Sequence, residues 1–205
     1  MTADARLERW LAAVLATPGL TAAESSIDAR RALLDDSLQV ADLVQDGPVV
    51  DVGSGGGSPG IPIAAARPKL RVDLLEARRR KCAFLETAAA EFPNAEVVCA
   101  RAEDYGRAAG REAYGTAVAQ ALARPPVALE WCLPLVKTGG QVILLAGKVD
   151  LDAATLAAAA VGGGTPRVIP APGSARRAFV LVPKIARTPD GFPRRAGMAR
   201  KRPLA

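Results

Sequence analysis

The chain has 205 residues, of which 50% are hydrophobic, 4% aromatic and 23% charged, and its net charge is +6. This composition is typical of a globular domain with a substantial core and excludes a disordered or fibrous protein. The chain contains no histidine, which excludes imidazole-based triads, general bases and the common zinc and iron sites, so we expect no metal.

Residues 1–46 predict a short N-terminal helical cap. Apolar residues recur at helical spacing at Leu7, Trp10, Leu11 and Val14. A second helix is predicted to begin at the capping pair Ser25 and Asp28 and to end before a break at residues 46–48. The first ten residues lack the hydrophobic stretch of a signal peptide, and no apolar run approaches the ~18 residues of a membrane span. We therefore expect a cytoplasmic protein without a membrane partner.

Between residues 47 and 183, short apolar runs alternate with helical segments, which predicts a parallel sheet with helices on both faces. The expected strands are Val49–Val52, Val72–Leu75, Val97–Ala100, Thr116–Ala119, Val142–Leu145, Val168–Pro170 and Phe179–Val182. The expected helices between them include Ile61–Ala66, Arg79–Glu91, Val127–Leu135 and Leu151–Ala160. Residues 171–177 are too few for a helical crossover, so the last two strands should form an antiparallel hairpin. We expect an α/β fold with a Rossmann-like, seven-stranded sheet.

A glycine-rich turn follows the first expected strand. Five of the eight residues 53–60 are glycines. A purely structural turn does not need so many, whereas a ligand at the carboxyl end of a strand needs close approach to the backbone. The residues predicted to form a cofactor site here are Asp51, Gly53, Ser54, Gly55, Gly57 and Ser58.

The ligand of this turn could be a dinucleotide or S-adenosylmethionine. Residues 55–60 match the G-x-G-x-x-G pattern of NAD-binding proteins, and Glu76 follows at the spacing of a ribose-binding acid. The carboxylate of Asp51 would, however, face the negative pyrophosphate of a dinucleotide. S-adenosylmethionine has no phosphate and carries a sulfonium and an ammonium. Glu76 would then bind the ribose, and Ala102 and Glu103 would border the adenine, so S-adenosylmethionine is favoured and NAD is the rival.

The three cysteines, Cys82, Cys99 and Cys132, include no C-x-x-C pair. An odd number at wide spacing argues against a disulfide framework. We expect all three to be buried as small hydrophobic residues, without a reactive role.

The excess positive charge lies at the C-terminal end. Residues 184–205 contain seven basic residues and one acid, so the other 183 residues contain 20 of each. The prolines and glycines of this stretch predict a basic tail that does not pack into a core and that suits an anionic partner such as RNA; a merely solvated tail is the alternative. A second basic cluster stands at the start of an expected helix, where cations oppose the helix dipole. The candidate RNA-binding residues are Arg78, Arg79, Arg80, Lys81, Lys148, Arg194, Arg195, Arg200, Lys201 and Arg202.

Several of these segments resemble the RsmG (GidB) family, the guanine-N7 methyltransferases of small-subunit ribosomal RNA. The most specific match is residues 51–63, which end in Pro-Gly-Ile-Pro. Further similarity lies in residues 36–38, 74–76, 80–85, 101–104, 130–135, 139–140 and 188–197. The resemblance covers roughly residues 20–200.

The resemblance implies a class I S-adenosylmethionine-dependent methyltransferase fold. It implies S-adenosylmethionine as the methyl donor and a guanine of 16S rRNA, free or in the small ribosomal subunit, as the acceptor, and we expect a monomer. Gln120 stands where the family usually has an arginine, and the resemblance assigns it to positioning cofactor and substrate. Guanine N7 has a lone pair and no proton, so a chain without histidine can methylate it by positioning alone. Two alternatives stay open: a divergent homologue with another acceptor or no activity, and a noncatalytic RNA-binding protein.

Overall fold

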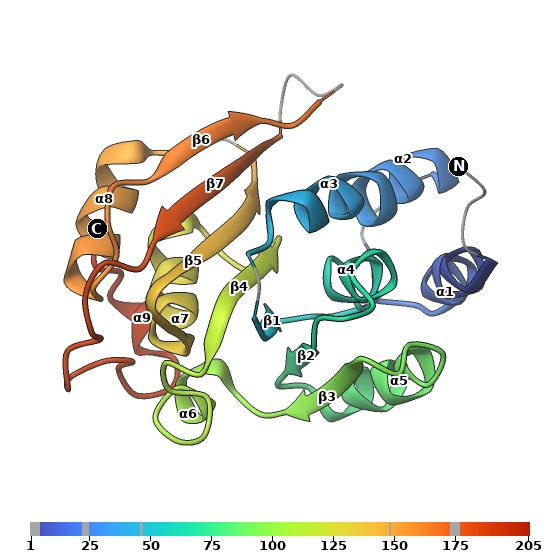
Figure 1. The fold of residues 1–205 in the computed structure, drawn as a ribbon, viewed down its shortest axis with the longest axis horizontal. Coiled ribbons are helices and arrows are strands. Elements are labelled where there is room, and N and C mark those ends of the chain that lie inside the picture. Colours follow the sequence, from blue (N-terminus) through green and yellow to red (C-terminus); the bar gives the residue numbers. More distant parts are fainter. Residues whose placement is uncertain (1–4, 22–24, 46, 148, 173–176) are drawn as a thin grey trace.

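Helices form the N-terminal part of the computed structural model, which describes residues 5–21, 25–45, 47–147, 149–172 and 177–205 (Figure 1). They are α1 (Ala5–Ala16), α2 (Ser26–Ala29), a π-helical turn (Arg30–Asp35) and α3 (Asp36–Leu43). The buried face of α1 consists of Leu7, Trp10, Leu11 and Val14, as the spacing predicts. Ser25 Oγ accepts the N–H of Asp28 at 3.1 Å and caps α2. Within the described residues, no helix has the length and apolar character that a membrane crossing needs.

A seven-stranded sheet follows, in the order β3-β2-β1-β4-β5-β7-β6. Its strands are β1 (Val49–Val52), β2 (Val72–Glu76), β3 (Ala95–Cys99), β4 (Tyr114–Gln120), β5 (Val136–Ala146), β6 (Arg167–Pro170) and β7 (Ala178–Pro183). The first five are parallel, and β7 runs antiparallel to both β5 and β6. The predicted sheet and its terminal hairpin are confirmed.

Helices cover both faces of this sheet (Figure 1). They are α4 (Gly60–Ala66), α5 (Arg79–Ala89), α6 (Ala102–Tyr105), α7 (Pro125–Cys132) with a 3-10 turn (Leu133–Leu135), α8 (Leu151–Ala160) and α9 (Met198–Lys201). Successive strand side chains point to opposite faces, so Val49 packs with α1, α3, α4 and α5, whereas Val50 and Val52 pack with α7 and α8. This arrangement leaves the carboxyl ends of β1, β2 and β4 at one edge of the sheet.

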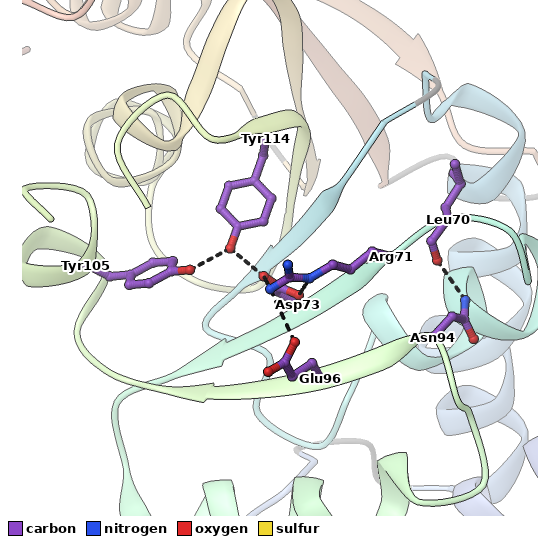
Figure 2. A network of polar contacts seen from close by, with 7 residues as sticks. All are labelled: Leu70, Arg71, Asp73, Asn94, Glu96, Tyr105 and Tyr114. Atoms are coloured by element: carbon purple, nitrogen blue, oxygen red, sulfur yellow. Dashed lines mark hydrogen bonds and ion pairs between the residues drawn. The ribbon is translucent and has the colours of Figure 1, made fainter. Parts of the chain in front are cut away.

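A buried polar network ties the opposite, amino-terminal ends of the strands together (Figure 2). Asp73 in β2 is 0% exposed and accepts hydrogen bonds from Arg71 Nε at 2.8 Å and from Tyr114 Oη at 2.5 Å. Tyr105 Oη lies 2.8 Å from Tyr114 Oη, and Arg71 also pairs with Glu96. Burial and the bond to Asp73 raise the pKa of Tyr114. The network satisfies a buried carboxylate and is remote from the carboxyl ends of the strands.

The C-terminal residues pack against the domain, so the prediction of a tail outside the core was wrong. Lys184, counted as part of the tail, is 1% exposed, and its Nζ donates to Val161 O at 2.8 Å and Thr188 Oγ1 at 2.6 Å. Desolvation lowers the pKa of Lys184 to about 8. Ala199 in α9 is 1% exposed and packs against α7. The composition of a segment gives only its average polarity. Packing of this segment depends on individual contacts, such as the hydrogen bonds of Lys184 and the contact of Ala199 with α7.

Cys82 and Cys99 form a disulfide, so the expectation that all three cysteines are unpaired and buried was wrong; Cys82 is buried, but Cys99 at the end of β3 is exposed. They are 17 residues apart, yet β3 runs parallel to β2 after the return of the chain through α5, so Cys99 at the end of β3 comes within 5.8 Å (Cα–Cα) of Cys82 at the start of α5. Sequence spacing alone does not reveal this return path. Cys132 is free and buried, as expected.

Candidate functional site

The glycine turn after β1 is held by hydrogen bonds to the buried carboxylate of Asp51, in β1. This carboxylate is 0% exposed, and its Oδ2 accepts the Ser54 hydroxyl at 2.6 Å and the Gly60 N–H at 3.0 Å. Burial raises the pKa of Asp51 to about 7. The expectation that Asp51 faces the ligand was therefore wrong, because its side chain lies beneath the turn and holds Ser54 and Gly60 of the turn by hydrogen bonds.

Two glycines of the turn are required by sterics. Gly53 has φ +73°, and a Cβ there would lie 2.4 Å from the side chain of Leu122. Gly60 faces the strands, and a Cβ there would lie 2.3 Å from Leu74 and 2.8 Å from Asp51 Oδ2. At Gly53 the left-handed backbone itself disfavours a side chain, whereas at Gly60 a Cβ would press on the buried Asp51 side chain and move the turn away from the sheet.

A first hollow of about 460 Å³ lies at the carboxyl ends of β1, β2 and β3. It is lined by Gly53, Glu76, Ala102 and Glu103, four of the predicted cofactor residues. Glu76 is 7% exposed; its Oε2 accepts the N–H of Gly55 at 3.1 Å and its Oε1 the N–H of Arg78 at 2.8 Å. The hollow thus presents two nearly buried carboxylates, which suit the hydroxyl and amino donors of a nucleoside.

A second hollow of about 440 Å³ lies on the other side of the turn, toward the helical cap. Its lining includes Ser54, Gly55, Ser58, Lys81 and Gln120. Gln120 joins the turn to the cap, because its Oε1 accepts the Ser58 hydroxyl at 2.6 Å and its Nε2 donates to Ala32 O at 2.9 Å. Both ends of this amide are therefore held in place.

A third hollow of about 370 Å³ opens between β4, β5, β7 and α3. Asp36, at the start of α3, lines it with 3% exposure and forms an ion pair with Arg177. Burial raises the pKa of Asp36, and the guanidinium of Arg177 opposes that shift. Sequence analysis gave neither residue a role, although Asp36 stands in a segment quoted for the resemblance.

The three hollows meet at Ala121, immediately after β4, which lines all of them. Ala121 has φ +50°, an uncommon backbone conformation for a residue with a Cβ and one found at functional sites. Gly53 lines both the first and the second hollow. An elongated ligand lying across the first two would therefore pass over the glycine turn and have its middle next to the third.

The predicted basic residues fall into different settings. Arg78, Arg79, Arg80, Arg195, Lys201 and Arg202 are exposed. Lys81 lines the first and second hollows. Arg194 is paired with buried Glu130, and the guanidinium of Arg200 lies 5.1 Å from the centre of the Trp131 ring. Lys148 lies outside the described residues.

A family model described as GidB, rRNA small subunit methyltransferase G, matches residues 7–168. The chain belongs to this family. A methyltransferase G of Pelotomaculum thermopropionicum is 40% identical over 166 residues, which are 76% of this chain and 69% of the relative. Its counterpart in Rubrobacter xylanophilus is 37% identical over 193 residues, 88% of this chain and 72% of the relative.

Solved methyltransferases share the fold of this GidB family member. A predicted O-methyltransferase from Agrobacterium tumefaciens superposes with a TM-score of 0.60 at 23% identity, covering 74% of this chain and 82% of that one. The 16S rRNA methyltransferase RsmC of T. thermophilus, solved with AdoMet and guanosine, gives 0.56 at 17% identity, covering 78% of this chain and 41% of that one. The chain thus has the class I methyltransferase fold.

S-adenosylmethionine is the cofactor of this family, and the site fits it. Gly53 lines the first hollow with left-handed backbone that favours the absence of a side chain, the carboxylates of Glu76 and Glu103 line the same hollow, and Gly53 also lines the second. Among the described residues, no group of carboxylate and thiol side chains is placed to hold a metal ion.

Proposed function

We propose that the chain transfers a methyl group from S-adenosylmethionine to N7 of a guanine in 16S rRNA, free or in the small ribosomal subunit. The observation that carries this proposal is the meeting of the three hollows at Ala121, two for an elongated cofactor and one for an acceptor base. A single chain lines all three, which supports a monomer as the active form. We place the reaction in the cytoplasm because the family acts on ribosomal RNA.

The residues of the first two hollows have complementary tasks. S-adenosylmethionine supplies an electrophilic methyl group when bound. Glu76 would accept hydrogen bonds from the ribose hydroxyls, and Glu103 from the adenine amino group. Lys81 lines both hollows, and its ammonium would pair with the carboxylate of the methionine end.

The third hollow would hold the guanine. N7 has a free lone pair, so the chain needs no general base and only has to place the ring, and placement alone contributes about 7–11 kcal/mol in favourable cases. Gln120, fixed at both ends of its amide, keeps the boundary between the second and third hollows rigid. Asp36 offers a carboxylate to the guanine N1–H and amino group, which lie on the edge opposite N7.

The test is transfer of labelled methyl groups to 16S rRNA and to purified small subunits that lack the modification. Cleavage chemistry specific for 7-methylguanine would then map the product. We expect one labelled guanine with the wild-type chain and strongly reduced transfer with Glu76→Ala. Tight RNA binding without any transfer would support the noncatalytic alternative, and a label at a position other than guanine N7 would support the divergent homologue.

A further inference from the structure

The residues Arg194–Arg202, here named the C-terminal segment, lie beside the first hollow. Gly197 and Arg200 of this segment line the hollow together with Trp131 of α7. Composition predicted a free basic tail at this place. The segment instead forms part of the surface on which the nucleoside half of the cofactor would rest.

The segment is fixed to α7 by one buried pair and one apolar contact. Glu130 is 1% exposed and accepts hydrogen bonds from Arg194, with Nε–Oε1 at 2.7 Å and Nη2–Oε2 at 2.5 Å. Arg194 also donates to Arg202 O at 2.8 Å, which closes the segment on itself. Ala199 packs against Trp131 between these anchors. A bidentate pair with a buried carboxylate gives the segment a defined position.

Gly197 connects the segment to a predicted adenine-binding residue. Its N–H donates to Glu103 Oε1 at 3.0 Å, and Glu103 is 6% exposed in the same hollow. The left-handed backbone of Gly197, with φ +82°, accompanies this contact. One oxygen of the Glu103 carboxylate is thereby held by the segment, and this bond orients the carboxylate in the hollow.

Arg200 completes the rim. Its guanidinium lies over the Trp131 ring at 5.1 Å, and its Nη2 donates to Leu122 O at 3.3 Å, so it spans from α7 to the loop after β4. Planar guanidinium and indole groups are suited to contact a flat aromatic ring. Leu122 also lines the first and third hollows, so Arg200 contacts the loop at which the cofactor and acceptor spaces meet.

We propose that the C-terminal segment is the outer wall of the adenosine half of the cofactor site, in which Arg200 and Trp131 contact the adenine and Gly197 positions Glu103. This reassigns Arg200 from RNA binding to cofactor binding. The inference rests on the proposed function for the identity of the cofactor.

The first test uses the fluorescence of Trp131. The chain has two tryptophans, so Trp131 is the sole reporter in a Trp10→Phe protein. We expect 5′-methylthioadenosine, which carries the adenosine half, to change the emission of Trp131, and methionine to leave it unchanged. Saturating binding of methylthioadenosine without a change in Trp131 emission would overturn the proposal that Trp131 and the C-terminal segment contact the adenine.

The second test compares two arginines of the segment. Arg200→Gln should weaken S-adenosylmethionine binding in calorimetric titration by about fivefold, the size of a cation–π and stacking contact. Arg202→Gln removes the same charge from an exposed position of the segment and should change this affinity less than twofold. Equal effects of the two substitutions would overturn the assignment. Cofactor binding by the wild type without methyl transfer to RNA would contradict the proposed function. It would not contradict the role of the C-terminal segment in binding the adenosine half of the cofactor.

Discussion

Replacing Arg194 with methionine should destabilise the fold markedly, although the residue lies in a stretch whose composition is that of a tail. The substitution keeps an apolar stem and removes the guanidinium that binds both oxygens of Glu130. Removing one member of a buried ion pair costs about 3–5 kcal/mol, because a charge is left buried without its partner. Glu130 is 1% exposed, but the Arg194 side chain is 24% exposed, so water can partly replace it. We therefore expect the lower end, about 3 kcal/mol of unfolding free energy.

Urea unfolding followed by circular dichroism at neutral pH measures this loss. Arg195→Met is the matched control, because Arg195 is exposed on the same segment and its loss should cost less than about 0.5 kcal/mol. In the double variant Arg194→Met with Glu130→Gln, the buried charge is gone as well. The double variant should then be less destabilised than the sum of the two single variants by about 1–2 kcal/mol. A loss for Arg194→Met no larger than the control, or strict additivity, would refute a buried, coupled pair.

Three further predictions concern pH, acceptor choice and RNA. The pKa of Asp51 is raised to about 7 in the folded chain. At pH values between its ordinary pKa and 7, Asp51 is therefore more often protonated in the folded chain than in the unfolded chain. Its contribution to unfolding free energy is therefore present at low pH and lost as pH rises to about 7, and Asp51→Asn should flatten that dependence in urea titrations at several pH values. Asp36→Asn should lower kcat/KM for a guanine acceptor about tenfold. It should also reduce the preference for guanine over inosine, which lacks the amino group. An unchanged preference in paired kinetic assays would show that Asp36 does not contact the amino group of the base. Lys201→Gln should weaken RNA binding and reduce the slope of log affinity against log salt by about one, while calorimetry shows unchanged cofactor affinity; an unchanged slope would exclude a phosphate contact.

The strands and the glycine turn could be predicted because their signals are local. Each expected strand is an apolar run, and six of the seven lie within an observed strand; the third, Val97–Ala100, runs one residue past the end of β3 at Cys99. The largest difference is β5, which begins at Val136 and not at Val142, because Val136 pairs with Tyr114 at the start of β4 and the register then shifts before Gln141 pairs with Thr116. Periodicity does not report such pairing.

The parts of the site that sequence reasoning missed depend on contacts between distant residues. Arg194 and Glu130 are 64 residues apart, and Gly197 and Glu103 are 94 apart. Charge counting grouped Arg194 and Arg200 with the RNA-binding cations, because it does not show which carboxylate or ring each one meets. Its position before the glycines placed Asp51 at the turn, but only the burial of its side chain shows that it lies beneath the ligand surface.

Methyl transfer to matched RNAs tests attack by guanine N7 most directly. One RNA carries guanine at the acceptor position, and the other carries 7-deazaguanine there, which keeps every edge of the base except the N7 lone pair. We predict single-turnover transfer of one methyl group to the guanine RNA and none to the 7-deazaguanine RNA, with similar binding of both. Equal transfer to the two RNAs would contradict attack by N7, and with it the assignment of the third hollow to a guanine presented without a general base.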